Sequence, residues 1–234
     1  MRNLLTASFV FIFLTGVGFS FNSCSKKSES LIINPTVNPV PYSLMVYFIT
    51  PTDKSFNPQY YTGAKACILR LQAWYKSQMG NNKTFVLNPV VVDTLTGLHN
   101  SSWYNSNNGD SISGTSGLIA YYNIKYEMKH LLRANFDTAH FTYFVYVEAD
   151  FPDETIPRGL ATEGLGNLVG ISGDSPESWI GTSGHALGHS FGLPEPKIQN
   201  SQAIMSTGWS KYPNCILQPA EKDSLNASPF FQIN

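Results

Sequence analysis

Two histidines one helical turn apart are the residues of this sequence best suited to chemistry. His185 and His189 lie in the stretch GHALGHSFGLPE, which also contains Gly192 and Glu195. Residues four apart on a helix project from one face, so the two imidazoles can hold one tetrahedral zinc ion. Gly192 allows a sharp turn that returns Glu195 as a third ligand, because carboxylate oxygens bind zinc at distances similar to those of imidazole nitrogens. The pattern predicts a metal site made by His185, His189 and Glu195.

A second interpretation leaves Glu195 as a solvated loop acid, so that any metal would have two protein ligands. The spacing favours three ligands, because Gly188, Gly192 and Glu195 all stand in register with the histidines. A serine hydrolase is not favoured, since the Gly-x-Ser-x-Gly nucleophile elbow occurs nowhere in the chain.

The histidine stretch resembles the zinc helix of metzincin-type metallopeptidases, whose pattern is H-E-x-x-H-x-x-G-x-x-H. Met205, ten residues after Glu195, lies in AIMSTG, which resembles the methionine turn of that clan. Similarity to bacterial zincin-like peptidases covers most of residues 44–231, including QAWY at 72–75 and LQPAE at 217–221. The resemblance implies zinc ligands at His185, His189 and position 195, a general base at position 186, and Met205 as the floor beneath the metal.

Two positions depart from that pattern. Ala186 stands where the resemblance implies the general-base glutamate, and Glu195 stands where it implies the last histidine. In such peptidases zinc polarises the scissile carbonyl and acidifies a bound water, whose proton the glutamate removes. Ala186 cannot accept a proton, and positioned acid–base groups are worth typically about 10²–10⁴-fold in rate. We therefore expect zinc to bind and peptide hydrolysis to be nearly abolished.

Three functions remain open from the residues. The first is a zinc-binding pseudopeptidase lipoprotein that uses the former substrate cleft to bind a peptide or protein. The second is an active zinc-dependent endopeptidase with a displaced base, for which Glu163, Glu195 and Tyr212 are available by type. The third is a metal-free binding lipoprotein that keeps only the fold.

The elements that must position these residues alternate between strands and helices. Apolar runs predict strands at 44–49, 85–87, 90–92, 141–147 and 168–171. Helical spacing predicts helices at 57–79, 118–134, 178–191 and 219–225, and the Asn/Ser/Gly-rich stretch 99–117 predicts a surface loop. This order predicts an α/β domain with a mostly parallel twisted sheet. The resemblance implies an α+β zincin-like domain with a long zinc-site helix and a methionine turn.

The N-terminal sequence indicates a lipoprotein. Residues 1–23 have the basic start and apolar segment of a signal peptide. Ser23-Cys24 resembles a bacterial lipoprotein cleavage site, which implies a lipid on Cys24. Residues 24–42, polar and containing prolines, would then tether a domain at 43–234 to a bacterial membrane, outside the cytoplasm. Plain secretion with an incidental Cys24 is the alternative.

Cys67 and Cys215 are the two remaining cysteines. An oxidising compartment would allow them to pair, but two buried free thiols agree equally well with the sequence.

Composition limits the partners. The 234 residues suit one domain after a leader, and the 13% charged content lies below the usual ~25%. A formal net charge of -1 provides no electrostatic reason to expect nucleic acid. We expect a monomer whose partner is a peptide or protein.

Overall fold

The computed structural model describes residues 39–108, 118–152, 154–156 and 159–233. The expected signal peptide, Cys24 and the tether up to residue 38 lie outside the described residues. Within the described ranges, no helix is both long and apolar enough to cross a membrane.

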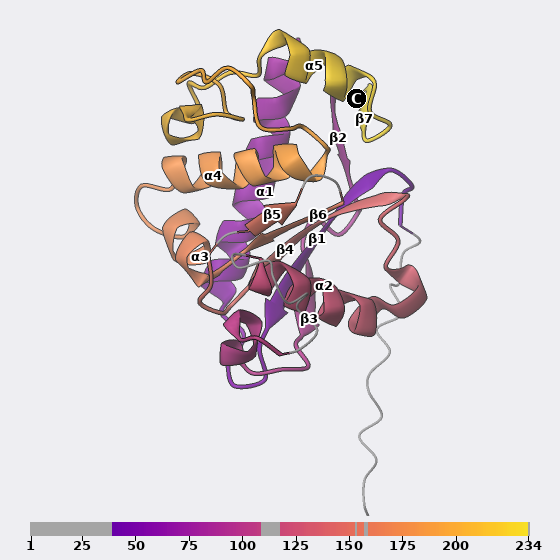
Figure 1. Ribbon diagram of the computed structural model, residues 1–234, viewed down its shortest axis with the longest axis vertical. Coiled ribbons are helices and arrows are strands. Elements are labelled where there is room, and N and C mark those ends of the chain that lie inside the picture. Colours follow the sequence, from indigo (N-terminus) through magenta and orange to yellow (C-terminus); the bar gives the residue numbers. More distant parts are fainter. Residues whose placement is uncertain (1–38, 109–117, 153, 157–158, 234) are drawn as a thin grey trace, which may run out of the picture. The chain divides into compact units, whose positions relative to one another are not determined.

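A seven-stranded sheet forms the centre of the fold (Figure 1). Its strands are β1 (Ser43–Thr50), β2 (Lys83–Leu87), β3 (Asp93–Thr96), β4 (Phe141–Val147), β5 (Glu154–Ile156), β6 (Leu160–Glu163) and β7 (Phe231–Ile233). The order is β5-β6-β4-β1-β2-β7. β3 pairs with the same edge of β1 as β2, farther along that strand. β1 pairs in parallel with β2, β3 and β4, and β4 with β6, whereas β5 and β7 run antiparallel to their neighbours. The expected α/β architecture with a mostly parallel sheet is confirmed.

Helices cover both faces of the sheet. They are α1 (Pro58–Gln78), α2 (Ile119–Leu132), α3 (Leu165–Ile171), α4 (Glu177–Ser190) and α5 (Pro219–Asn226), with 3₁₀ turns η1 (Ser101–Asn105), η2 (Arg133–Asn135) and η3 (Gly208–Lys211). Side chains alternate along β1, because successive residues of a strand point to opposite faces. Those at 44, 46 and 48 share a core with α1, α3 and α4, and those at 45, 47 and 49 share a core with α2. The histidine helix α4 therefore packs on the same face as α1.

Helix ends follow local sequence signals. The Asn57 side chain caps α1 by accepting hydrogen bonds from the backbone N–H groups of Gln59 and Tyr60. α1 ends before Gly80, which adopts φ +72°. At α5, Gln218 and Glu221 form a capping box, and Pro219 occupies the first turn. The expected bounds of these helices hold to within one residue.

Two expected strands are wrong. Residues 168–171 lie in α3, where Leu168 and Ile171 are buried three residues apart while Val169 is 51% exposed, so the apolar pattern follows a helical period. Residues 90–92 form a bend between β2 and β3. β2 and β3 pair with the same edge of β1, so between them the chain must leave the sheet and return to that edge. The expected loop 99–117 contains the turn η1, and residues 109–117 lie outside the described part.

Cys67 and Cys215 are both free and buried in the core beneath α4. Burial raises the pKa of the Cys67 thiol to about 12 and that of Cys215 to about 11. The cysteines therefore do not form a disulfide in this structure.

Candidate metal centre

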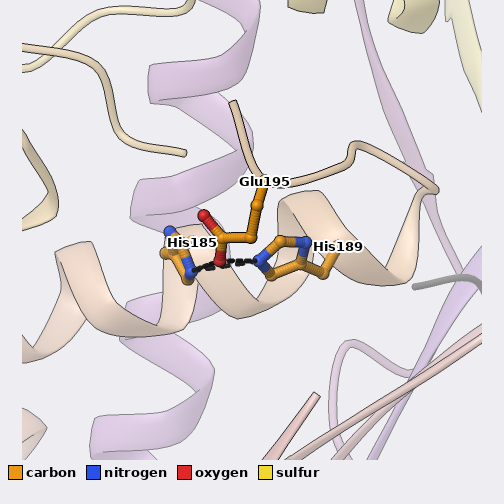
Figure 2. Close-up of side chains that lie close together, drawn as sticks. All are labelled: His185, His189 and Glu195. Atoms are coloured by element: carbon orange, nitrogen blue, oxygen red, sulfur yellow. Dashed lines mark hydrogen bonds and ion pairs between the residues drawn. The ribbon is translucent and has the colours of Figure 1, made fainter. Parts of the chain in front are cut away.

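α4 places the two histidines side by side (Figure 2). The Nε2 atoms of His185 and His189 lie 3.0 Å apart, as expected for side chains one turn apart on a helix. The His189 side chain is 7% exposed and that of His185 is 23% exposed, so both rings are largely removed from water.

The C-terminus of α4 returns the chain toward the histidines. Gly192 adopts φ +95°, its N–H donates to the His189 carbonyl, and the Leu193 N–H donates to the Gly188 carbonyl. These two bonds form a Schellman motif, which needs a residue in the left-handed region at the position of Gly192. Glu195 follows, and its Oε1 lies 3.0 Å from His189 Nε2 and 3.4 Å from His185 Nε2. The structure thus brings all three expected ligands together.

Backbone carbonyls determine which nitrogen of each ring carries the proton. His185 Nδ1 lies 2.9 Å from the Ile204 carbonyl oxygen, and His189 Nδ1 lies 2.8 Å from that of Leu193. A carbonyl oxygen only accepts hydrogen bonds, so each Nδ1 carries the hydrogen. Burial lowers the pKa of His185, which favours the neutral ring. Both Nε2 atoms therefore present lone pairs to one point, the arrangement seen in metal-ligating histidines.

The three atoms suit one divalent cation. In a tetrahedral site with ligand distances of about 2.0–2.1 Å, donor atoms lie about 3.3 Å from one another, close to the separations found here. No fourth histidine, cysteine or carboxylate among the described residues joins this cluster. The residues fit a metal with three protein ligands and a fourth position left for water or a ligand.

The segment expected to form the methionine turn packs directly against α4. Met205 is fully buried, and a Cβ added at Gly188 would collide with its sulfur. The Gly208 N–H donates to the Ala203 carbonyl, and the Ile204 N–H donates to the Ile216 carbonyl, which close the turn. This turn therefore holds the Ile204 carbonyl against His185.

A row of glycines on α4 permits this close packing. A Cβ at Gly181 would collide with the backbone carbonyl of Trp209, and one at Gly184 would meet Ile204 and Leu71. This surface, and the carbonyls that orient the histidines, were not predicted from the sequence. Glycines spaced three and four apart within a helix were the available signal for the surface. The carbonyls leave no signal in side-chain types.

Ala186, one residue after the first histidine, is 4% exposed and belongs to the core cluster beneath α4. Glu163, a candidate for a displaced base, is the last residue of β6 and is fully buried. Tyr212 is 6% exposed and packs beside Trp74. Neither Glu163 nor any other described acid except Glu195 joins the histidine cluster.

A cavity opens beside Glu195. It measures about 360 Å³ and lies between the loop 193–198 and α5, with Glu195 in its wall. The metal centre therefore adjoins a recess large enough for a ligand side chain.

The chain matches no protein-family model and no curated protein sequence. Among solved structures, two crystal forms of wild-type OgpA from Akkermansia muciniphila match with TM-scores of 0.58 and 0.59 at 16% and 17% identity. These matches cover 82% and 87% of this chain and 62% and 66% of OgpA. Catalytically inactive OgpA in complex with an O-glycopeptide substrate, glycodrosocin, matches with a TM-score of 0.57 at 18% identity, over 82% of this chain and 62% of OgpA. The chain thus spans less than two thirds of OgpA and shares its fold, in agreement with the expected α+β zincin-like arrangement.

Proposed function

We propose that this chain is a zinc-binding, metallopeptidase-like protein whose hydrolytic step is absent or strongly impaired. One observation carries the proposal: His185, His189 and Glu195 converge, and each ring is oriented by a carbonyl at its Nδ1. Two imidazoles and a carboxylate are a ligand set that zinc accepts.

The impairment follows from position 186. When bound, zinc would polarise a carbonyl and lower the pKa of a water molecule. Ala186 has no group that accepts a proton from that water. Among the described residues, Glu195 is the one carboxylate in the cluster. Its Oε1 lies 3.4 Å from His185 Nε2 and 3.0 Å from His189 Nε2. A carboxylate that binds the metal is poorly placed to act as its base.

We propose a peptide or protein as the ligand. Glu195, whose side chain is 64% exposed, connects the metal centre with the adjacent cavity, so a bound chain can contact both. The shared fold with OgpA, whose inactive form was crystallised with an O-glycopeptide, supports a peptide-containing ligand. From the sequence around Cys24 we further propose attachment to a bacterial membrane by a lipid, outside the cytoplasm, with the protein a monomer.

Elemental analysis of protein purified without chelators tests the zinc proposal. We expect about one zinc per chain, loss of zinc in His189→Ala, and a higher melting temperature with added zinc than with EDTA, because a ligand that binds only the folded state stabilises it. His140→Ala is the matched control, since His140 is exposed and lies outside the cluster. Zinc content near zero in the unmodified protein would favour a metal-free binding protein.

A proteolysis assay with casein and peptide libraries tests the impairment. We expect cleavage at or near background with zinc fully bound. Zinc-dependent cleavage at ordinary enzyme rates would favour the active endopeptidase with a displaced base. Glu195→Gln then becomes the first variant to test, because Gln keeps the shape of the side chain and loses its basicity.

A further inference from the structure

A second cavity lies at the C-terminal end of α4, between it and the segment from α5 to β7. It measures about 390 Å³, within the size range of small-molecule pockets, which begins near 300 Å³. Four parts of the chain form it: the end of α4 with the turn after it, the start of β4 with the residues before it, Gly159 before β6, and the segment from α5 to β7. Its polar side chains are all hydroxyls, namely Thr138, Thr142, Ser190, Ser224 and Ser228.

The lining residues that the structure describes carry no charge. No lysine, arginine, histidine, aspartate or glutamate is among the described residues that form it. A phosphate or carboxylate ligand would need cationic donors there, and a metal ion or amine would need carboxylates. The lining therefore favours a neutral ligand.

Thr142 contributes a hydroxyl to this lining. It is 1% exposed, and no side-chain hydrogen bond within the described part of the chain involves its hydroxyl. Its oxygen is not among the fully buried polar atoms that lack a partner, so it can be reached from the cavity. Ser190, also 1% exposed, donates to the Leu187 carbonyl and keeps its acceptor capacity. Both groups line a cavity in which a ligand hydroxyl can hydrogen-bond to them.

Aromatic rings provide an apolar wall. Phe191 and Phe230 both line the cavity, with ring centroids 6.1 Å apart and planes inclined at 44°. Phe230 is only partly buried. The C–H face of a sugar ring packs well on such a surface, because the face of an aromatic ring carries partial negative charge. Hydroxyls that both donate and accept, next to an aromatic wall and without charge, match the chemistry of a saccharide.

We infer that this cavity binds a neutral saccharide of one or two rings, either free or attached to a peptide. The site is separate from the metal cluster, although the turn 192–195 connects the two: Gly192 lines the saccharide cavity and Glu195 lies at the metal centre. A sugar-bearing peptide could therefore place its saccharide on one side of this turn and its backbone on the other. The inference stands on the cavity's own residues and holds whether or not zinc binds.

Saturation-transfer NMR on the whole EDTA-treated chain tests it, so that failure of the zinc proposal does not affect the result. The probes are methyl galactoside, methyl glucoside, a short serine peptide carrying O-linked galactose, and the same peptide without sugar. We expect transfer to sugar ring protons and little transfer to the bare peptide. Similar transfer to the bare peptide, or none to any sugar, would overturn the inference. Transfer to the glycosides identifies free sugar as sufficient, and transfer to the glycopeptide alone identifies the attached form.

Two variants locate the site. Thr142→Val removes the hydroxyl while keeping the shape, and we expect affinity to fall about tenfold, as for one lost hydrogen bond. Thr94→Val, at an exposed threonine of β3, is its control. Ala227→Trp fills the cavity from its exposed rim and should abolish binding without disturbing the core, whereas Asn226→Trp, at the adjacent exposed position outside the lining, should not. Unchanged binding in both Thr142→Val and Ala227→Trp would place any sugar elsewhere and reject this cavity.

Discussion

The sulfur of Met205 occupies the space that a side chain at Gly188 would need. Gly188 lies between His185 and His189 on α4, and Met205 follows Ile204, whose carbonyl orients His185. The contact therefore joins the helix that carries two ligands to the turn that orients one of them.

Gly188→Ala should destabilise the protein by about 1–3 kcal/mol, because the added methyl overpacks a core in which Met205 is fully buried. Gly166→Ala in α3 is the control: nothing lies within 4 Å of an added Cβ there, so stability should stay equal or rise by about 0.4–1 kcal/mol. Urea unfolding of the metal-free proteins measures both changes. Equal stabilities of the two variants would contradict the packing described here.

Restoring a carboxylate tests whether base loss is the main defect. Ala186→Glu should raise zinc-dependent peptide hydrolysis by roughly 10²–10⁴-fold over the unmodified chain. The new side chain enters a position that is 4% exposed, so the melting temperature must be recorded with the rate. Ala186→Gln has the same size without a base and should remain inactive. Equal rates for the Glu and Gln variants would show that the missing base is not what limits hydrolysis. Ala186→Glu combined with Glu195→His then tests the third ligand.

A buried carboxylate on the opposite face of the sheet predicts a pH dependence. Glu127 of α2 is fully buried, accepts a hydrogen bond from the Leu98 N–H, and lies 3.6 Å from His99 Nδ1. Burial raises the pKa of Glu127, because the charged form loses its hydration. The pKa of this carboxyl is higher in the folded protein than its value near 4.5 in the unfolded chain. The fold is therefore most stable, with respect to this group, below pH 4.5. That stability is lost as the pH rises through the folded-state pKa.

Glu127→Gln should remove that loss, since the amide keeps an acceptor for Leu98 and does not titrate. Melting temperatures measured in EDTA from pH 4.5 upward should therefore diverge, with the variant gaining relative to the unmodified protein as the pH rises. A constant or shrinking difference would contradict the assigned direction of the pKa shift.

The two core thiols should be unreactive in the folded protein. Thiolates react, and burial raises the pKa of Cys67 to about 12 and of Cys215 to about 11. In a Cys24→Ser background, a chromogenic disulfide reagent at pH 8 should detect almost no thiol before denaturation and two per chain afterwards. Fewer than two after denaturation without reductant would indicate a disulfide between Cys67 and Cys215.

Lipid attachment at Cys24 is tested separately, in a bacterial host. The full chain should partition into detergent with membranes, and the Cys24→Ser variant should be released into soluble fractions. Cys67→Ser is the matched control, because Cys67 is buried in the core and free. Mass spectrometry of the N-terminal peptide identifies the lipid, and an unmodified Cys24 together with an unchanged distribution would favour plain secretion.

Much of the local structure was readable from the sequence. The central strand β4 was predicted at its observed bounds, and α1, α4 and α5 to within one residue, because apolar periodicity and end signals such as Asn57-Pro58 act over a few residues. Helix α3 was missed, and a strand was expected at 168–171, because a short apolar run does not distinguish a strand from a helix that is buried on one side. Short strands such as β6 form because they pair with a neighbouring strand, and the local sequence does not show that pairing.

The same division applies to the candidate metal centre. The identities and spacing of His185, His189, Gly192 and Glu195 determined that two imidazoles share one helix face and that a carboxylate can return to them, since helix geometry and the left-handed glycine are local properties. For His189 the local turn also decided which ring nitrogen points inward, through the Leu193 carbonyl four residues later, whereas for His185 only tertiary structure did so, through the distant Ile204 carbonyl. Tertiary structure also placed Glu163 outside the ligand cluster and Thr142 in the wall of a cavity. Such relations depend on contacts between segments far apart in the chain, and these exist only once the sheet and α4 have packed.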